Sequence, residues 1–198
     1  PGSSTPMPAR GAERLPDPTG YIYRMDISYA LTAMCVMIDS TSEGGSMTLE
    51  EFFKDNGKVA LAFSGGVDSA FLLYAASMMG ADARAYYVKT PFQPRFELED
   101  ARRLADELGA SLKVLEADVL SCPDITSNPP DRCYLCKRII MGAIREAASE
   151  DGYELVIDGT NASDDVSDRP GVKALRELGV RSPLRECGIC KDEIRRRS

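Results

Sequence analysis

A short apolar segment runs directly into two adjacent glycines, and this junction constrains the fold more than any other feature of the chain. Residues 59–63 read Val-Ala-Leu-Ala-Phe, a run too short for a buried helix and typical of a buried strand. Ser64-Gly65-Gly66 follows, and apolar residues at helical spacing begin at Val67. Adjacent glycines allow a sharp turn and a close approach to a ligand, and N–H groups at a helix start favour phosphate. The sequence therefore predicts a strand, an anion-binding loop and a helix, with an ordinary glycine-rich connection as the alternative.

The loop differs from two common phosphate-binding motifs. No Gly-Lys-Ser/Thr closes it, as a Walker A motif requires. Its glycines also lack the Gly-x-Gly-x-x-Gly spacing of dinucleotide-binding loops. Both of these nucleotide-binding classes are therefore excluded for this segment.

Composition limits the chemistry that the chain can perform. Its 198 residues are 43% hydrophobic and 28% charged, which is typical of one globular domain with a real core. The net charge of −7 argues against nucleic acid as the main partner. The chain has no histidine, so any metal would be held by Cys, Asp or Glu. No segment is long and apolar enough to span a membrane, and we expect a cytoplasmic protein.

Four of the six cysteines form two Cys-x-x-Cys pairs, Cys133 with Cys136 and Cys187 with Cys190. In an intracellular chain this spacing suggests metal or sulfur chemistry rather than a disulfide scaffold. The first pair falls on the first turn of an expected helix with basic neighbours, and both features favour thiolate over thiol. The alternative is that these cysteines are buried as small hydrophobic residues.

The chain divides into an extension and a domain. Residues 1–46 are rich in Pro, Gly, Ser and Thr at their start and in Gly and Ser at their end, a composition that predicts a flexible N-terminal extension. A partner-binding helix within it is the alternative. Residues 47–198 are predicted to form the folded domain, which begins with a helix capped by Thr48.

Expected strands and helices alternate through the domain. Strands are expected at 58–63, 83–88, 111–117, 154–157 and 180–184, and helices at 69–79, 97–108, 133–148, 172–178 and from 191. This alternation predicts an α/β, Rossmann-like fold with a doubly wound, parallel, five-stranded sheet. Ligands bind such sheets beyond the carboxyl ends of the strands. Each conspicuous loop follows a strand, so we expect these loops to share one edge.

Residues 64–69, Ser-Gly-Gly-Val-Asp-Ser, resemble the loop of the PP-loop ATP pyrophosphatases, which have the adenine nucleotide α-hydrolase-like fold. They match the Ser-Gly-Gly-x-Asp-Ser pattern at every fixed position. Members of that superfamily cleave ATP between the α and β phosphates, grip the leaving pyrophosphate with this loop and transfer AMP to a substrate. The resemblance implies that the ATP phosphates are surrounded by Ser64, Gly65, Gly66, Val67, Asp68 and Ser69.

Four later motifs narrow the resemblance from the superfamily to one family within it. They are Asn-Pro-x-x-Arg-Cys-Tyr-x-Cys-Lys at 128–137, Asp-Gly-Thr-Asn at 158–161, Asp-Arg-Pro-Gly at 168–171, and Arg-Ser-Pro-Leu at 181–184 followed by Glu-Ile-Arg. In this order they resemble the ATP-dependent sacrificial sulfur transferase family LarE, which acts in the synthesis of the nickel-pincer nucleotide cofactor. That family adenylylates a carboxylate of a pyridinium dicarboxylate mononucleotide. Sulfur from a protein cysteine, or from an iron–sulfur cluster in the multi-cysteine subtype, then gives a thiocarboxylate.

The resemblance also implies cofactors, partners and site residues. The expected cofactors are ATP and Mg²⁺, with a 4Fe–4S cluster in the cluster-containing subtype. The expected partner is a small anionic nucleotide, and a homo-oligomer is expected. The strand end that faces the phosphates would carry Asp158, Gly159, Thr160 and Asn161. The chemistry would be carried by Cys133, Cys136, Asp68 and Arg169. Asp164 and Asp168 are weaker candidates for ordering the site or binding a metal ion. Arg169 would meet an anion, and a structural salt bridge is its alternative role.

Two departures from the family bear on the cysteines. The family chain continues past the position of Ser198, and its downstream cysteine is missing from this sequence, so an incomplete enzyme is one expectation. The other departure is that Cys187 and Cys190 stand where no family cysteine is expected. We hypothesise a site in which they join Cys133 and Cys136 around a 4Fe–4S cluster or Zn²⁺. In the alternative they merely pack.

Three other functions remain compatible with the loop. The first is a tRNA-thiolating PP-loop enzyme, which the negative net charge disfavours. The second is an amide-forming ligase of the same superfamily, which leaves the Arg-Cys-Tyr-x-Cys-Lys stretch without a role. The third is a non-catalytic remnant that binds ATP.

Overall fold

The computed structural model describes residues 47–119, 131–164 and 170–197. The extension predicted at 1–46 and the candidate residues Asp168 and Arg169 lie outside the described residues. Within the described ranges the chain forms an α/β fold around one parallel sheet. The predicted fold class is therefore confirmed.

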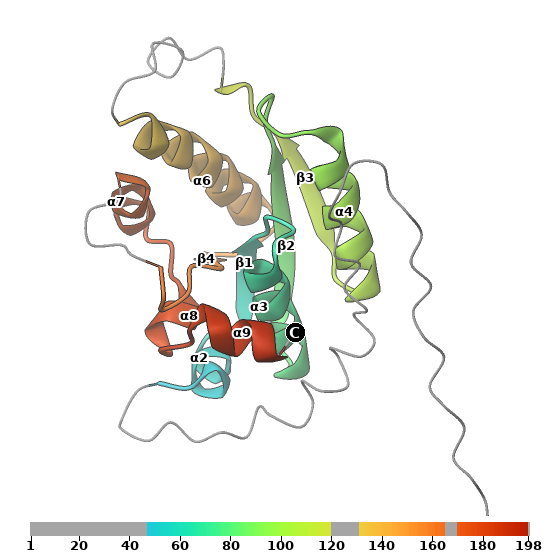
Figure 1. Ribbon diagram of the computed structural model, residues 1–198, viewed down its shortest axis with the longest axis vertical. Coiled ribbons are helices and arrows are strands. Elements are labelled where there is room, and N and C mark those ends of the chain that lie inside the picture. Colours follow the sequence, from blue (N-terminus) through green and yellow to red (C-terminus); the bar gives the residue numbers. More distant parts are fainter. Residues whose placement is uncertain (1–46, 120–130, 165–169, 198) are drawn as a thin grey trace, which may run out of the picture.

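Four parallel strands form the sheet, in the order β3-β2-β1-β4 (Figure 1). They are β1 (Lys58–Ala62), β2 (Asp82–Lys89), β3 (Leu112–Glu116) and β4 (Leu155–Asp158). Val59 of β1 lies opposite Ala83 of β2 and Leu155 of β4. All four agree with predicted strands to within one or two residues.

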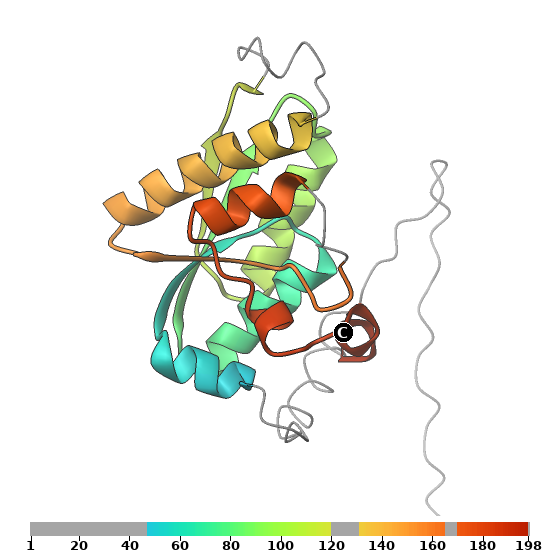
Figure 2. The same cartoon turned by 90° about the vertical axis from the view of Figure 1, so that its left-hand side faces the viewer.

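Helices cover both faces of this sheet. They are α2 (Leu49–Asp55), α3 (Val67–Met78), α4 (Arg95–Glu107), α6 (Arg132–Glu150), α7 (Pro170–Glu177), α8 (Pro183–Glu186) and α9 (Lys191–Arg197). Helices α6 and α7 lie side by side on one face, and α3 and α4 lie on the other (Figures 1 and 2). No helix among the described residues combines the length and the apolar character needed to cross a membrane.

The strand β1 is apolar from Val59 to Ala62 because both of its faces are covered by helices. Val59 and Leu61 belong to the core formed with α2, α3 and α4. Ala60, between them, belongs to the core formed with α6 and α7. Alternate residues of β1 thus pack on opposite faces of the sheet.

The predicted Thr48 cap is confirmed at the start of α2. The Glu51 N–H donates to Thr48 Oγ1 at 3.1 Å, and the Thr48 N–H donates to Glu51 Oε2 at 2.8 Å. This reciprocal pair is a capping box, which satisfies two otherwise free donors at the helix start.

The predicted fifth strand is wrong. Residues 180–184 make a single bridge to the sheet, between Arg181 and Ile157. Pro183 has no N–H group to donate to a strand and begins α8 instead. The extended segment is therefore too short to form a strand, and the described sheet has four strands.

The order of the strands reverses beside β1. Strands β2 and β3 lie on one side of it and β4 lies on the other. The connections that leave the carboxyl ends of β1 and β4 therefore separate, which leaves room between them for a ligand. The glycine loop at 64–66 and the segment from Gly159 to Asp164 flank this point.

Candidate active site

A cleft of about 400 Å³ opens at the reversal of strand order. Its volume is within the range of small-molecule sites. The loop after β1 contributes Gly66, the loop after β4 contributes Gly159, α6 contributes Lys137 and α9 contributes Lys191. The predicted loops after β1 and β4 therefore share one edge of the sheet, as expected.

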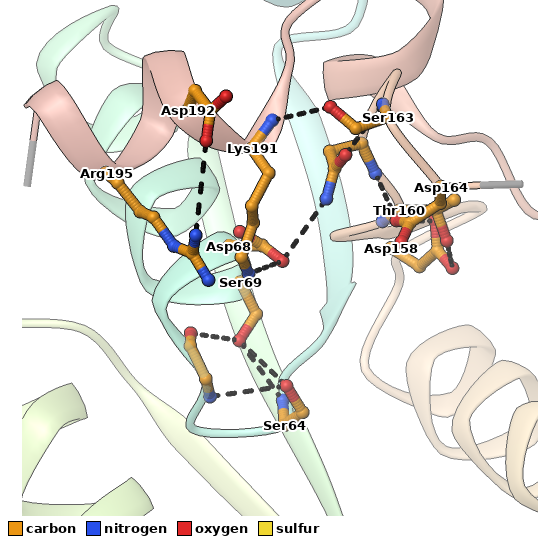
Figure 3. A network of polar contacts seen from close by, with 12 residues as sticks. Ser64, Asp68, Ser69, Asp158, Thr160, Ser163, Asp164, Lys191, Asp192 and Arg195 are labelled. Carbon is orange, nitrogen blue, oxygen red and sulfur yellow. Dashed lines mark hydrogen bonds and ion pairs between the residues drawn. The ribbon is translucent and has the colours of Figure 1, made fainter.

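Hydrogen bonds between two serines and a glycine hold the glycine loop in shape. The Ser69 hydroxyl donates to the Gly66 carbonyl oxygen at 2.9 Å, and the Gly66 N–H donates to Ser64 Oγ at 3.3 Å. The two hydroxyl oxygens lie 3.1 Å apart (Figure 3). Ser69 is only 3% exposed and Ser64 is exposed, and both serines line the cleft.

Gly65 and Gly66 have separate roles in the loop. Gly65 has a φ of +74°, and a Cβ there would lie 3.1 Å from the Cβ of Ala101 in α4. Gly66 is the N-cap of α3, and no side chain caps that helix. The N–H groups of the first turn of α3 are therefore available to an anion, with the positive end of the helix dipole behind them.

Gly159 brings the loop after β4 against the start of α3. A Cβ at this position would lie 3.0 Å from the Ser69 nitrogen and 3.3 Å from the Asp68 carbonyl carbon. Both atoms belong to the backbone of a helix, so neither can move freely. Glycine is therefore needed here to bring the two walls of the cleft together.

Replacing Gly159 with alanine should lower the free energy of unfolding by about 1–3 kcal/mol. Urea titration followed by circular dichroism measures this loss. Gly142→Ala is the matched control, since its Cβ would meet no atom within 4 Å and alanine is the better helix former by up to about 1 kcal/mol. Equal stability of the two variants would contradict the close contact.

Asp68 has one paired and one unpaired carboxylate oxygen. Its Oδ2 lies 2.5 Å from the Lys191 ammonium and accepts from Asn161 Nδ2 at 3.4 Å. Its Oδ1 is buried and has no hydrogen-bond partner among the described residues. A buried oxygen without a partner is unfavourable, and Asp68 lines the cleft at the uncapped start of α3. It therefore fits a ligand of Mg²⁺, which binds one or two carboxylates together with phosphate oxygens.

Asp158 uses its carboxylate to hold the loop after β4. Its Oδ1 accepts from the Ser182 hydroxyl at 2.7 Å, and its Oδ2 accepts from the Thr160 hydroxyl at 2.7 Å. The side chain is only 4% exposed. Asp158, Gly159 and Thr160 line the cleft, and the Asp158 carboxylate is engaged by protein groups.

Asn161 connects this loop to Asp68. Besides its bond to Asp68, its Oδ1 accepts from the Ser163 N–H at 2.8 Å. Its own N–H donates to Asp164 Oδ2 at 3.0 Å. Asn161 is 2% exposed, so it supports the site as a buried residue that links the loop after β4 to Asp68. Asp164 itself lines the cleft and is a second carboxylate that could hold a metal ion.

Cys133 and Cys136 lie on the first turns of α6, beside the cleft. Cys133 is exposed and Cys136 is partly buried, and both are free thiols. Lys137 follows on the same helix and lines the cleft. Residues four apart share a helix face, so Cys133 lies one turn from a cleft-lining residue. The first cysteine pair is therefore at the same edge of the sheet as the glycine loop.

The four-thiolate hypothesis is not supported. No group of three or more Cys, Asp or Glu side chains that could hold a metal ion occurs within the described residues. Cys187 packs against the core on the α2 and α3 side of the sheet, whereas α6 covers the opposite face. Burial raises the pKa of the Cys187 thiol to about 11, which makes it a poor metal ligand. The residues present therefore do not fit a four-thiolate cluster, and the packing alternative describes Cys187.

Two residues of the site were missed from the sequence. Lys191 pairs with Asp68, and Ser182 bonds to Asp158. A lysine in the first turn of a helix is electrostatically unfavourable, and that signal could have indicated an anion near Lys191. Ser182 falls in the quoted Arg-Ser-Pro-Leu motif, which here supports the loop after β4.

Comparison with known proteins finds relatives that align with about three quarters of this chain. An uncharacterised protein of Synechocystis sp. is 37% identical over 148 residues, which are 74% of this chain and 55% of the relative. The pyridinium-3,5-bisthiocarboxylic acid mononucleotide synthase of Lactiplantibacillus plantarum is 35% identical over 150 residues, or 75% and 54% of the two chains. One chain of the glutamine-hydrolysing GMP synthase of Methanococcus maripaludis is 28% identical over 162 residues, or 75% and 52%. The chain thus spans about half the length of the curated relatives it matches, and no family model matches it.

A solved structure supports the fold. The NH3-dependent NAD synthetase of Campylobacter jejuni superposes with a TM-score of 0.53 and 21% identity, over 87% of this chain and 72% of that one. Together with the glycine loop at the reversal of strand order, these relatives support the predicted assignment to the PP-loop ATP pyrophosphatase superfamily. Within that superfamily it lies near LarE, the family of the L. plantarum synthase.

Proposed function

We propose that the chain uses ATP to adenylylate a carboxylate of a pyridinium dicarboxylate mononucleotide, releases pyrophosphate and then inserts sulfur. The observation that carries this proposal is the cleft in which the glycine loop, the uncapped start of α3 and Asp68 meet. The printed name of the L. plantarum relative, a bisthiocarboxylic acid mononucleotide synthase, supports the substrate class.

In the first step a carboxylate oxygen of the substrate bonds to the α phosphorus of ATP, and the bond from that phosphorus to the β-phosphate oxygen breaks. A carboxylate is ionised at neutral pH, so the step needs no general base, and the lack of histidine is no obstacle. The backbone around Gly65 and Gly66 would stabilise charge on the leaving pyrophosphate. Mg²⁺, when bound, would neutralise phosphate oxygens, and Asp68 and Asp164 are the residues that would hold it.

In the second step a cysteine thiolate attacks the carbonyl carbon of the acyl adenylate and AMP leaves, which gives a thioester. Loss of the Cα proton of that cysteine and cleavage of its Cβ–S bond would then release the thiocarboxylate and leave dehydroalanine in the chain. Cys133 is the best-placed thiol, because it is exposed and lies one helical turn from cleft-lining Lys137. Cys136 is the second thiol on the same turn.

ATP–pyrophosphate exchange tests the first step. Radiolabel from pyrophosphate should enter ATP only when the pyridinium dicarboxylate mononucleotide is present. The matched control is the same pyridinium mononucleotide without its carboxyl groups, which offers no nucleophile. ATP binding without exchange would contradict the proposal and favour the non-catalytic remnant.

A further inference from the structure

Phe92 and Arg132 meet across the edge of the sheet at which the cleft opens. Phe92 lies in the connection from β2 to α4, and Arg132 is the first residue of α6. The guanidinium carbon of Arg132 lies 5.4 Å from the centre of the Phe92 ring. Because α4 and α6 cover opposite faces of the sheet (Figures 1 and 2), the contact joins the two sides of this edge.

Both residues adjoin groups of the proposed reaction. Gln93, next to Phe92, lines the cleft, as does Lys137 on the second turn of α6. Cys133, next to Arg132, is the exposed thiol to which we assign sulfur insertion. A ligand held by Phe92 and Arg132 would therefore lie at the mouth of the cleft, beside this thiol.

The Phe92 ring is accessible and already carries a cation. It is 52% exposed, and Arg132 is exposed as well, so the ring contributes little to the core. The face of an aromatic ring attracts cations, including those of ligands. A pyridinium ring is a flat cation, so it suits this face both by its charge and by its ability to stack.

We propose that Phe92 recognises the pyridinium ring of the substrate, an inference that rests on the proposed function. The substrate ring stacks on Phe92 in place of the Arg132 guanidinium, because two cations on one face would repel each other. The displaced guanidinium then pairs with a carboxylate of the substrate, for which its planar set of N–H donors is suited. The pair thus selects a cationic ring that bears a carboxylate.

Binding of the pyridinium dicarboxylate mononucleotide, measured by isothermal titration calorimetry, tests the role of Phe92. Phe92→Leu should raise the dissociation constant by about 3- to 10-fold, as expected for loss of a cation–π contact. Phe92→Trp should retain the affinity, because tryptophan is the strongest cation–π partner. Phe96→Leu is the matched control, since Phe96 is also exposed but lies on α4, and it should leave the dissociation constant unchanged.

Fluorescence gives a second measurement at the same position. The chain has no tryptophan, so Phe92→Trp introduces a single fluorophore, which a stacked pyridinium ring should quench. Phe96→Trp should keep its fluorescence when the same ligand binds. Equal quenching of the two variants would overturn the proposal.

A neutral ligand separates charge from shape. The benzene analogue of the mononucleotide has carbon in place of the ring nitrogen, and its affinity should differ by less than about twofold between wild type and Phe92→Leu. An equal loss of affinity for the charged and neutral ligands would overturn the proposal.

The role of Arg132 is tested with the pyridinium mononucleotide that lacks carboxyl groups. Arg132→Gln should raise the dissociation constant of the dicarboxylate by about 10-fold or more. It should not weaken binding of the carboxyl-free compound, which has no carboxylate to pair. An equal loss for both compounds would contradict the exchange of partners.

Failure of this inference is distinguishable from failure of the proposed function. Wild-type affinity in Phe92→Leu, in a chain that carries out substrate-dependent exchange, would overturn the role of Phe92 alone. A wild-type chain that does not bind the pyridinium dicarboxylate mononucleotide would overturn the substrate assignment and the role of Phe92 together.

Discussion

Asp68→Asn should reduce the rate of substrate-dependent ATP–pyrophosphate exchange by a factor on the order of 10³. The substitution removes the negative charge that would hold Mg²⁺ and leaves the Lys191 ammonium unpaired beside the phosphate loop. The fold should change little, because the ion pair is partly exposed, with side chains 30% and 22% accessible, and such pairs contribute about 1 kcal/mol or less. The exchange rate at saturating Mg²⁺ and ATP is the measurement.

Asp55→Asn is the control for that experiment. Asp55 is exposed at the end of α2, so the same chemical change there should leave exchange at the wild-type rate. An Asp68→Asn variant with wild-type exchange would show that the unpaired Oδ1 has no part in the reaction, and would remove the basis for a metal site at this position.

Cys133→Ser should abolish formation of the thiocarboxylate product while leaving ATP–pyrophosphate exchange within about twofold of wild type. Serine lacks the sulfur, but the glycine loop and Asp68 that would act on ATP remain unchanged. Mass spectrometry of the nucleotide product measures sulfur insertion, and exchange measures adenylylation in the same samples. The two readouts therefore assign Cys133 to the second step alone.

Cys190→Ser provides a matched comparison. Cys190 is also an exposed free cysteine, but it lies before α9 rather than on α6, and its replacement should leave both readouts unchanged. Loss of thiocarboxylate in Cys190→Ser but not in Cys133→Ser would overturn the assignment of the sulfur step to α6.

The elements around the glycine loop could be predicted because their signals are local. The apolar run of β1 and the paired Gly65 and Gly66 together specify a strand, a turn and a helix start within 11 residues, 59–69. Strand and helix alternation then predicted the parallel sheet. The segment at 180–184 was also predicted to be a strand, but Pro183 lacks an N–H group and has a fixed φ, so a helix begins there instead.

The contacts between distant segments could not be predicted in this way. Asp68 and Lys191 are 123 residues apart in the chain, and only the packing of α9 on α3 brings them together. The spacing of Cys187 and Cys190 matched that of Cys133 and Cys136, but spacing does not specify which face of a sheet a helix covers. Ser182 was part of a recognised motif, yet its bond to Asp158 depends on the turn that Pro183 imposes.

The bond that the protein cleaves in ATP tests the central claim most directly. With ATP labelled at the γ phosphorus and the pyridinium dicarboxylate mononucleotide present, we predict that the label appears in pyrophosphate. Unlabelled AMP should form in an equimolar amount. Label in inorganic phosphate, with ADP as the nucleotide product, would mean that the loop at 64–69 does not direct cleavage between the α and β phosphates.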